Sequence, residues 1–133
     1  MNTRILYEYR DAANFRFHGS VTLAGEMTPA LWVRIRAACE DGEFFVAHQV
    51  GLPELFAAQP GRHVADPDYS ATGYPYHDDL DHCWHRWPDD PHTWSLTTDA
   101  PTDPRTVEEF VRDVEAAFKA GWEVFDPAER LEG

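Results

Sequence analysis

The chain has 133 residues, of which 43% are hydrophobic and 14% aromatic, and this is typical of one folded domain with a buried core. The frequency of Trp, Phe and Tyr excludes a disordered chain, and no apolar run approaches the roughly 20 residues of a membrane-spanning helix. The first residues lack an apolar signal region, and two cysteines, Cys39 and Cys83, are too few for a disulfide framework. We therefore expect a cytoplasmic protein with reduced thiols.

The formal net charge of −13 is spread unevenly along the chain. Residues 1–40 carry a net charge of +1, whereas residues 41–133 carry −14. A surface this acidic repels phosphate groups, so we expect no direct nucleic-acid binding. The charge favours solubility first, and it also suits a basic protein partner or a cation.

The N-terminal part of the chain predicts a β-hairpin. Apolar and polar residues alternate over residues 4–10 and again over residues 15–23. Turn-forming Asp and Asn residues at positions 11–14 connect the two segments. Gly19 interrupts the second apolar row, which indicates a β-bulge. We expect two antiparallel strands with one solvated face.

A helix follows the hairpin. Thr28 is a favourable N-cap and Pro29 suits the first helical position. An apolar stripe of helical period runs over residues 31–39, and Gly42 is the expected stop. Residues 43–51 return to an extended pattern rich in Phe and Val.

The second half begins with a long loop. Residues 58–79 hold several Pro and Gly residues and show little periodicity. Residues 82–87 and 92–98 are predicted strands, and the spacer Pro88-Asp89-Asp90-Pro91 is a predicted turn.

The last element is the clearest helix. Thr106 and Glu109 form a capping box, an apolar stripe follows up to Phe118, and Gly121 is the expected end. Beyond it the chain is charged and is expected to fray.

The order of these elements predicts an α+β fold. An antiparallel sheet of four to five strands with two helices on one face, a two-layer sandwich in the order β-β-α-β-β-β-α, covers both helical apolar stripes. We assign residues 1–125 to a single α+β domain and residues 126–133 to a frayed C-terminal tail.

Residues 76–87 hold three His, three Asp, one Cys and two Trp, more chemically active groups than any other stretch. Asp81, His82 and His85 supply ligand types that a divalent metal prefers. On a helix these three side chains would converge, whereas on a strand His82 and His85 would point to opposite faces. The neighbouring residues favour a strand, and no established metal motif is present.

The same groups are candidates for catalysis. Asp81 with His82 or His85 would form a base that works near neutral pH. The chain offers no nucleophile motif and no phosphate-binding loop. A metal-assisted hydrolase centred on Asp81, His82 and His85 is therefore one hypothesis.

A third set lies at the end of the predicted hairpin. Tyr9, Arg10, Asp11 and Asn14 would join the same site if the hairpin tip approaches residues 81–85. Asp11 would then be a further catalytic candidate, and the other three would bind. The alternative is that Arg10 and Asp11 stabilise the turn.

Trp84 and Trp87 lie in an acidic neighbourhood rich in aromatic residues. Exposed aromatic side chains surrounded by charge are typical of protein-recognition surfaces. The alternative is that they cover an open end of the sheet. Our first hypothesis is a small acidic partner-binding or regulatory protein of the inhibitor or immunity kind, without an enzymatic activity and without a certain cofactor.

Six short motifs extend over most of the chain: YRDxxN (residues 9–14), HGSV (18–21), DGEFF (41–45), VGLPELF (50–56), DHxWH (81–85) and RTVEEF (105–110). Together they resemble a family of small bacterial proteins for which no activity is known. The resemblance therefore implies no substrate. Cys83 occupies the variable position of DHxWH, which argues against a required cysteine nucleophile.

Overall fold

The structure, a computed structural model, describes residues 1–10, 16–55, 83–88 and 93–124. The expectations for Asp11, Asn14, Asp81 and His82, for the loop at 58–79 and for the tail at 126–133 lie outside the described residues.

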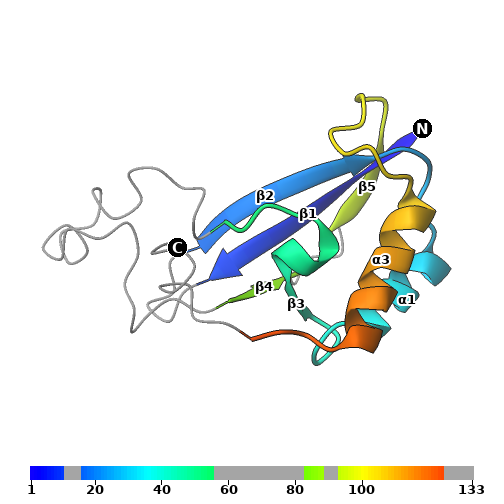
Figure 1. Cartoon of the computed structure of the whole chain (residues 1–133). Coiled ribbons are helices and arrows are strands. Elements are labelled where there is room, and N and C mark those ends of the chain that lie inside the picture. The colour runs from blue at the N-terminus through cyan, green and yellow to red at the C-terminus, as the bar shows by residue number, and fades with distance from the viewer. Residues whose placement is uncertain (11–15, 56–82, 89–92, 125–133) are drawn as a thin grey trace, which may run out of the picture.

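The described chain folds into one antiparallel sheet covered by helices, which confirms the predicted α+β fold (Figure 1). The strands follow the order β2-β1-β4-β3, and a further strand, β5, also pairs with β1. Their bounds are β1 Asn2–Arg10, β2 Arg16–Leu23, β3 Phe44–Val46, β4 Trp84–Arg86 and β5 Trp94–Thr97.

β4 and β5 lie end to end along the same edge of β1. Arg86 is the partner of Glu8, and Trp94 is the partner of Ile5. The two strands therefore share one position in the sheet and do not pair with each other, although only a short spacer separates them in sequence. Among the described strands, β1 is consequently the one that pairs with three others.

Two helices lie side by side on one side of the sheet (Figure 1). They are α1 (Pro29–Ala37) and α3 (Val107–Ala120), and a short 3-10 helix, η1 (Ala47–Val50), packs against α3. The guanidinium of Arg34 on α1 donates to Glu115 on α3, from Nε at 3.2 Å and from Nη2 at 2.5 Å. This hydrogen-bonded ion pair lowers the pKa of Glu115 and fixes the two helices together at the surface. None of the described helices has both the length and the apolar character that crossing a membrane requires.

The predicted helix starts are confirmed by hydrogen bonds. Thr28 Oγ1 accepts from the Leu31 amide at 3.2 Å. Thr106 and Glu109 form both bonds of the capping box at 3.1 Å, and α3 ends before Gly121 as expected.

Two boundary predictions are wrong. α1 ends at Ala37, several residues before Gly42, because Asp41 (φ 54°) and Gly42 (φ 72°) form a tight turn that pairs Glu40 with Phe44. The extended segment predicted over residues 43–51 is a strand only at β3, since η1 follows and Gly51 ends it with a φ of 73°.

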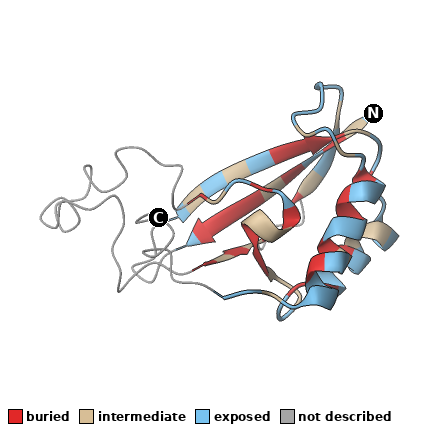
Figure 2. Ribbon diagram, viewed as in Figure 1, coloured by how far each residue is buried: buried red, intermediate tan, exposed pale blue. Residues whose placement is uncertain are grey.

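The core lies between the sheet and the helices, and buried residues line the facing sides of both layers (Figure 2). β1 contributes alternate side chains to it, among them Ile5, Tyr7 and Tyr9. Phe110, Val111 and Val114 of α3 are fully buried. The alternation of β1 and the stripe of α3 therefore meet across one apolar layer.

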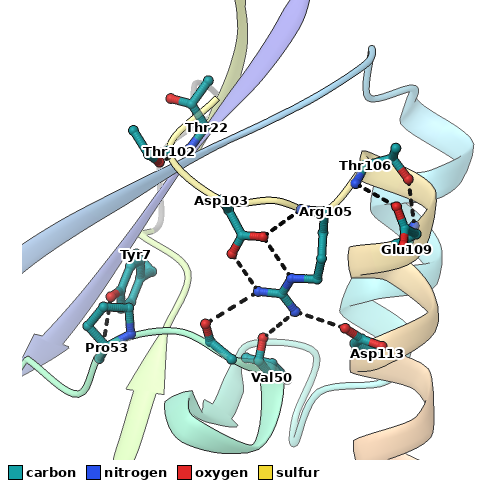
Figure 3. Close-up of polar contacts among 11 residues, drawn as sticks. Tyr7, Thr22, Val50, Pro53, Thr102, Asp103, Arg105, Thr106, Glu109 and Asp113 are labelled. Carbon is teal, nitrogen blue, oxygen red and sulfur yellow. Dashed lines mark hydrogen bonds and ion pairs between the residues drawn. The ribbon is translucent and has the colours of Figure 1, made fainter. Parts of the chain in front are cut away.

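Arg105 connects the segment before α3 to the rest of the fold (Figure 3). Its guanidinium donates to Val50 O at 2.7 Å, to Asp103 Oδ2 at 2.8 Å and to Asp113 Oδ2 at 3.0 Å. These bonds raise the pKa of Arg105 and lower that of Asp103. One side chain thereby joins η1, the linker and the first turns of α3.

Candidate functional site

His85 lies at the centre of the core and is fully buried. Its Nε2 accepts a hydrogen bond from the Leu55 amide at 2.9 Å, and its Nδ1 contacts Cys83 O at 3.4 Å. A carbonyl oxygen only accepts, so the imidazole carries its proton on Nδ1. The rings of Tyr9 (5.3 Å) and Tyr7 (6.0 Å) pack around it.

This arrangement determines what His85 can do. Both of its ring nitrogens are engaged by main-chain groups, which suits a structural histidine that fixes the segment at Leu55. Among the described residues there is no group of three or more His, Cys, Asp or Glu side chains that would hold a metal. Asp81 and His82, the other two proposed ligands, lie outside the described residues, as does Asp11.

The described binding candidates divide between the core and the surface. Tyr9 is buried and stacks on Phe17 with ring centroids 6.3 Å apart, whereas Arg10 is exposed at the end of β1. Trp87 is also buried and stacks on Phe45 with ring centroids 4.2 Å apart. Of the described residues in this set, only Trp84 and Arg10 reach the surface.

The two cysteines are buried as well. Trp87 Nε1 donates to Cys39 Sγ at 3.3 Å, and burial raises the pKa of the Cys39 thiol to about 11. Such a thiol stays protonated at neutral pH and is a poor nucleophile. Cys83 is 1% exposed, so neither cysteine is placed for surface chemistry.

The surface around Trp84 is hollowed. One hollow of about 350 Å³ is lined by Glu40, Trp84 and residues at the end of α3, namely Phe118, Gly121, Trp122 and Val124. A second hollow of about 430 Å³ is lined by Glu40, Asp41, Phe44 and Trp84. Because Glu40 and Trp84 line both, we describe the two hollows together as the Trp84 groove.

The local sequence explains how the groove is built from three elements. Trp84 precedes His85 on β4, so that it points to the opposite side of the strand from the core. The turn at Asp41 and Gly42 folds Glu40 back on Phe44, whose amide donates to Glu40 O at 2.8 Å. Two segments of the chain are thus held against the side of Trp84.

The third side of the groove follows α3. Gln49 of η1 holds the chain beyond the helix: its Nε2 donates to Gly121 O at 3.2 Å, and its Oε1 accepts from the Glu123 amide at 2.8 Å. Trp122 lies between these two contacts. Gln49 therefore positions the aromatic residue that closes this end of the groove.

The groove is apolar with an acidic rim. Its described lining contains Glu40 and Asp41 and no Lys, Arg or His. Phe118 is 51% exposed and Val124 is 69% exposed, although both are apolar. The groove therefore combines open apolar area with negative charge.

Sequence reasoning identified Trp84 and missed the rest of the groove. Phe118 belongs to the apolar stripe of the last helix but is 51% exposed, and Trp122 lies just beyond the end of that helix. Glu40 and Asp41 read as the polar end of a helix. Their contribution depends on the tight turn, which the chain uses to place Phe44 beside them.

Comparisons with protein-family models, with curated proteins and with solved structures gave no match for this chain.

Proposed function

We propose that this protein is a small partner-binding or regulatory protein, of the inhibitor or immunity kind, which binds a basic segment of another protein in the Trp84 groove. The bound segment would place an apolar side chain against Trp84 and a Lys or Arg side chain against Glu40 and Asp41. The observation that carries the proposal is the position of Trp84, which lines both hollows.

The apolar part of the groove would contribute to the free energy of binding. Phe118 and Val124 expose apolar area that a partner would remove from water at about 25 cal/mol per Å². Aromatic side chains set in hollows are frequent hot spots of protein interfaces. Trp84 is half-buried and so is already held in place, which lowers the entropy lost on binding.

The charged part supports selectivity. Glu40 and Asp41 are adjacent in sequence, and both are exposed. Carboxylates at the rim of a groove accelerate association with a basic partner and reject an acidic one. We therefore expect binding to weaken as the salt concentration rises.

The lining also favours binding over catalysis. The titratable side chains among the described lining residues are the two carboxylates of Glu40 and Asp41. A hydrolytic site would need a nucleophile or a base within reach of them, and the described lining supplies no Ser, Thr, Cys, His or Lys.

The test is affinity isolation followed by titration. The wild-type protein, Trp84→Ala and Phe118→Ser are used to isolate binding proteins from a lysate of the source organism, with Val33→Ser as the control. Val33 is 65% exposed on α1 and lies outside the groove lining, so its substitution changes a similar apolar surface.

We expect one stoichiometric partner with the wild type and with Val33→Ser. Calorimetric titration of this partner should show an affinity at least about 30-fold weaker for Trp84→Ala, which corresponds to about 2 kcal/mol of a hot spot. Recovery of no stoichiometric partner would refute the proposal. Equal affinity of all four proteins would refute the groove as the binding surface.

A further inference from the structure

β5 has an open outer edge. The Leu6 amide donates to Thr93 O at 2.8 Å, so the backbone groups of Thr93 point toward β1. Ser95, two residues on and paired with Arg4, points the same way. The backbone groups of Trp94 and Leu96 therefore point outward, and within the described part of the chain no backbone group bonds to them there.

β2, which pairs with the opposite side of β1, differs in its chemistry. The Thr22 amide donates to Thr102 Oγ1 at 2.9 Å, so one end of β2 is already covered by the linker before α3. The remainder carries exposed Arg16 and His18, and charge on an edge strand opposes pairing with other strands. β5, with the sequence Trp-Ser-Leu-Thr, carries no charge.

We propose that β5 pairs antiparallel with β5 of a second copy of this chain, so that two sheets join across a twofold axis. The outward groups determine the register. Trp94 pairs with Leu96 of the second copy through backbone hydrogen bonds, and Ser95 lies opposite Ser95 of the second copy at the axis.

The side chains agree with this register. Trp94 and Leu96 lie on the core-facing side of β5, where Leu96 is 41% exposed and Trp94 is half-buried. In the symmetric pair, each Trp94 contacts the Leu96 of the other copy, and aromatic–aliphatic cross-strand pairs stabilise a sheet. On the opposite side the two small Ser95 side chains meet without a steric conflict.

The β5 contact and the binding of a basic partner should respond to salt in opposite directions. Two copies with a net charge of −13 repel each other, and salt screens this repulsion beyond about 8 Å at physiological ionic strength. The uncharged β5 contact should therefore tighten as salt is added, whereas binding of a basic segment in the Trp84 groove should weaken. The two surfaces are also separate, since β5 pairs with Asn2–Ile5 and β4, which carries Trp84, pairs with Glu8.

Cross-linking tests the register. In a non-hydrogen-bonded antiparallel pair the Cα atoms lie about 4.5 Å apart, which is within the range of about 4.4–6.8 Å that a disulfide spans. Under mild oxidation we expect Ser95→Cys to form a covalent dimer in high yield. Ser20→Cys, an exposed position on β2, is the control, and native Cys39 and Cys83 are buried and should not react.

Sedimentation equilibrium over a concentration series tests the contact itself. We expect a dimer for the wild type, a loss of at least tenfold in its association constant for Leu96→Lys, and no change for Ser20→Lys. A wild type that stays monomeric at every concentration and salt level would overturn the proposal. A dimer insensitive to Leu96→Lys, or equal cross-linking of the two cysteine variants, would do the same.

Discussion

The ring of Tyr7 occupies the space that a side chain on Gly19 would fill. The two residues are direct partners in the β1–β2 ladder. A Cβ atom at Gly19 would lie 2.9 Å from Tyr7 Cε1 and from Leu55 Cδ2. Because this position is empty, Tyr7 extends across β2, and its hydroxyl donates to Pro53 O at 2.7 Å (Figure 3).

This contact corrects the prediction of a bulge at Gly19. The pairing of β1 with β2 runs without interruption from Thr3 and Leu23 to Arg10 and Arg16. The glycine is therefore required for the close approach of a ring and not for a break in the ladder.

Gly19→Ala should destabilise the protein by about 1–3 kcal/mol, the usual cost of overpacking a close contact. The backbone of Gly19 is not in the left-handed region, so the cost is steric. Urea unfolding followed by tryptophan fluorescence measures the change. Ser20→Ala, an exposed neighbour on β2, is the control, and a variant at Gly19 as stable as this control would contradict the contact.

Tyr7→Phe should change the response to alkaline pH. Burial raises the pKa of Tyr7 from 10.0 to about 12. The unfolded chain therefore ionises first, and the stability present below pH 10 is lost as the pH rises toward 12. The variant lacks this loss, although at neutral pH it should be about 1 kcal/mol less stable because Pro53 O loses its donor.

Unfolding free energies of both proteins, measured at intervals of roughly one pH unit between pH 8 and pH 12, test this expectation. Cys39, whose pKa is also raised, contributes equally to both, so the informative quantity is their difference. Parallel profiles of the two proteins would show that the Tyr7 hydroxyl is not buried in the folded state.

The features that depend on short-range interactions were predicted correctly from the sequence. The alternation of β1, the N-cap at Thr28 and the capping box at Thr106 depend on neighbours within a few residues, and the structure reproduces each of them. The end of α1 could not be predicted from Gly42, because the pairing of Glu40 with Phe44 ends the helix earlier.

The pairing of strands far apart in the sequence could not be predicted, for a physical reason. Alternation in the DHxWH motif says that Trp84 and His85 point to opposite sides of a strand, but the side that faces the core depends on the position of β4 between β1 and β3. The same register brings Trp87 into contact with Phe45, inside the core. The sequence therefore singled out the stretch that carries Trp84 and His85, but which of the two faces the core could be decided only from the sheet order.

Arg105→Gln should destabilise the protein by about 1.5–3 kcal/mol, since Val50 O and the carboxylate of Asp103 would lose a charged donor. Chemical unfolding measures the loss. Arg34→Gln is the matched control: it removes a guanidinium bonded to Glu115 at the surface, where solvent screens the pair, and its effect should be much smaller. Equal effects of the two substitutions would contradict the role of Arg105 as a connector.

The same network predicts that the stability of the protein changes with pH in the acidic range. Arg105 holds the pKa of Asp103 below its ordinary value. The contribution of Asp103 is therefore present above its unfolded pKa of about 3.9 and is lost as the pH falls through the lower folded value. The difference in stability between the wild type and Arg105→Gln should narrow as the pH falls below about 4, and a constant difference would contradict the pairing.

His85→Ala should be the most destabilising of these changes, by about 3 kcal/mol or more. It leaves a cavity among Tyr7, Tyr9 and Phe45, and it leaves the buried Leu55 amide without its acceptor. His18→Ala is the control, because the His18 side chain is 66% exposed and its Nε2 lies 3.4 Å from the largely buried carboxylate of Glu8. Unfolding in urea compares the two variants with the wild type.

The nitrogen chemical shifts of the imidazole give a second readout for the same residue. A histidine that accepts from Leu55 at Nε2 and donates to Cys83 O from Nδ1 must show a protonated Nδ1 and an unprotonated Nε2. Addition of zinc, manganese or nickel should leave these shifts unchanged, because both nitrogens are already engaged. A metal-dependent shift of Nε2 would instead mean that the imidazole leaves the core to bind a metal, and would restore the metal-assisted hydrolase as the better hypothesis. A His85→Ala variant as stable as His18→Ala would contradict the structural role of His85.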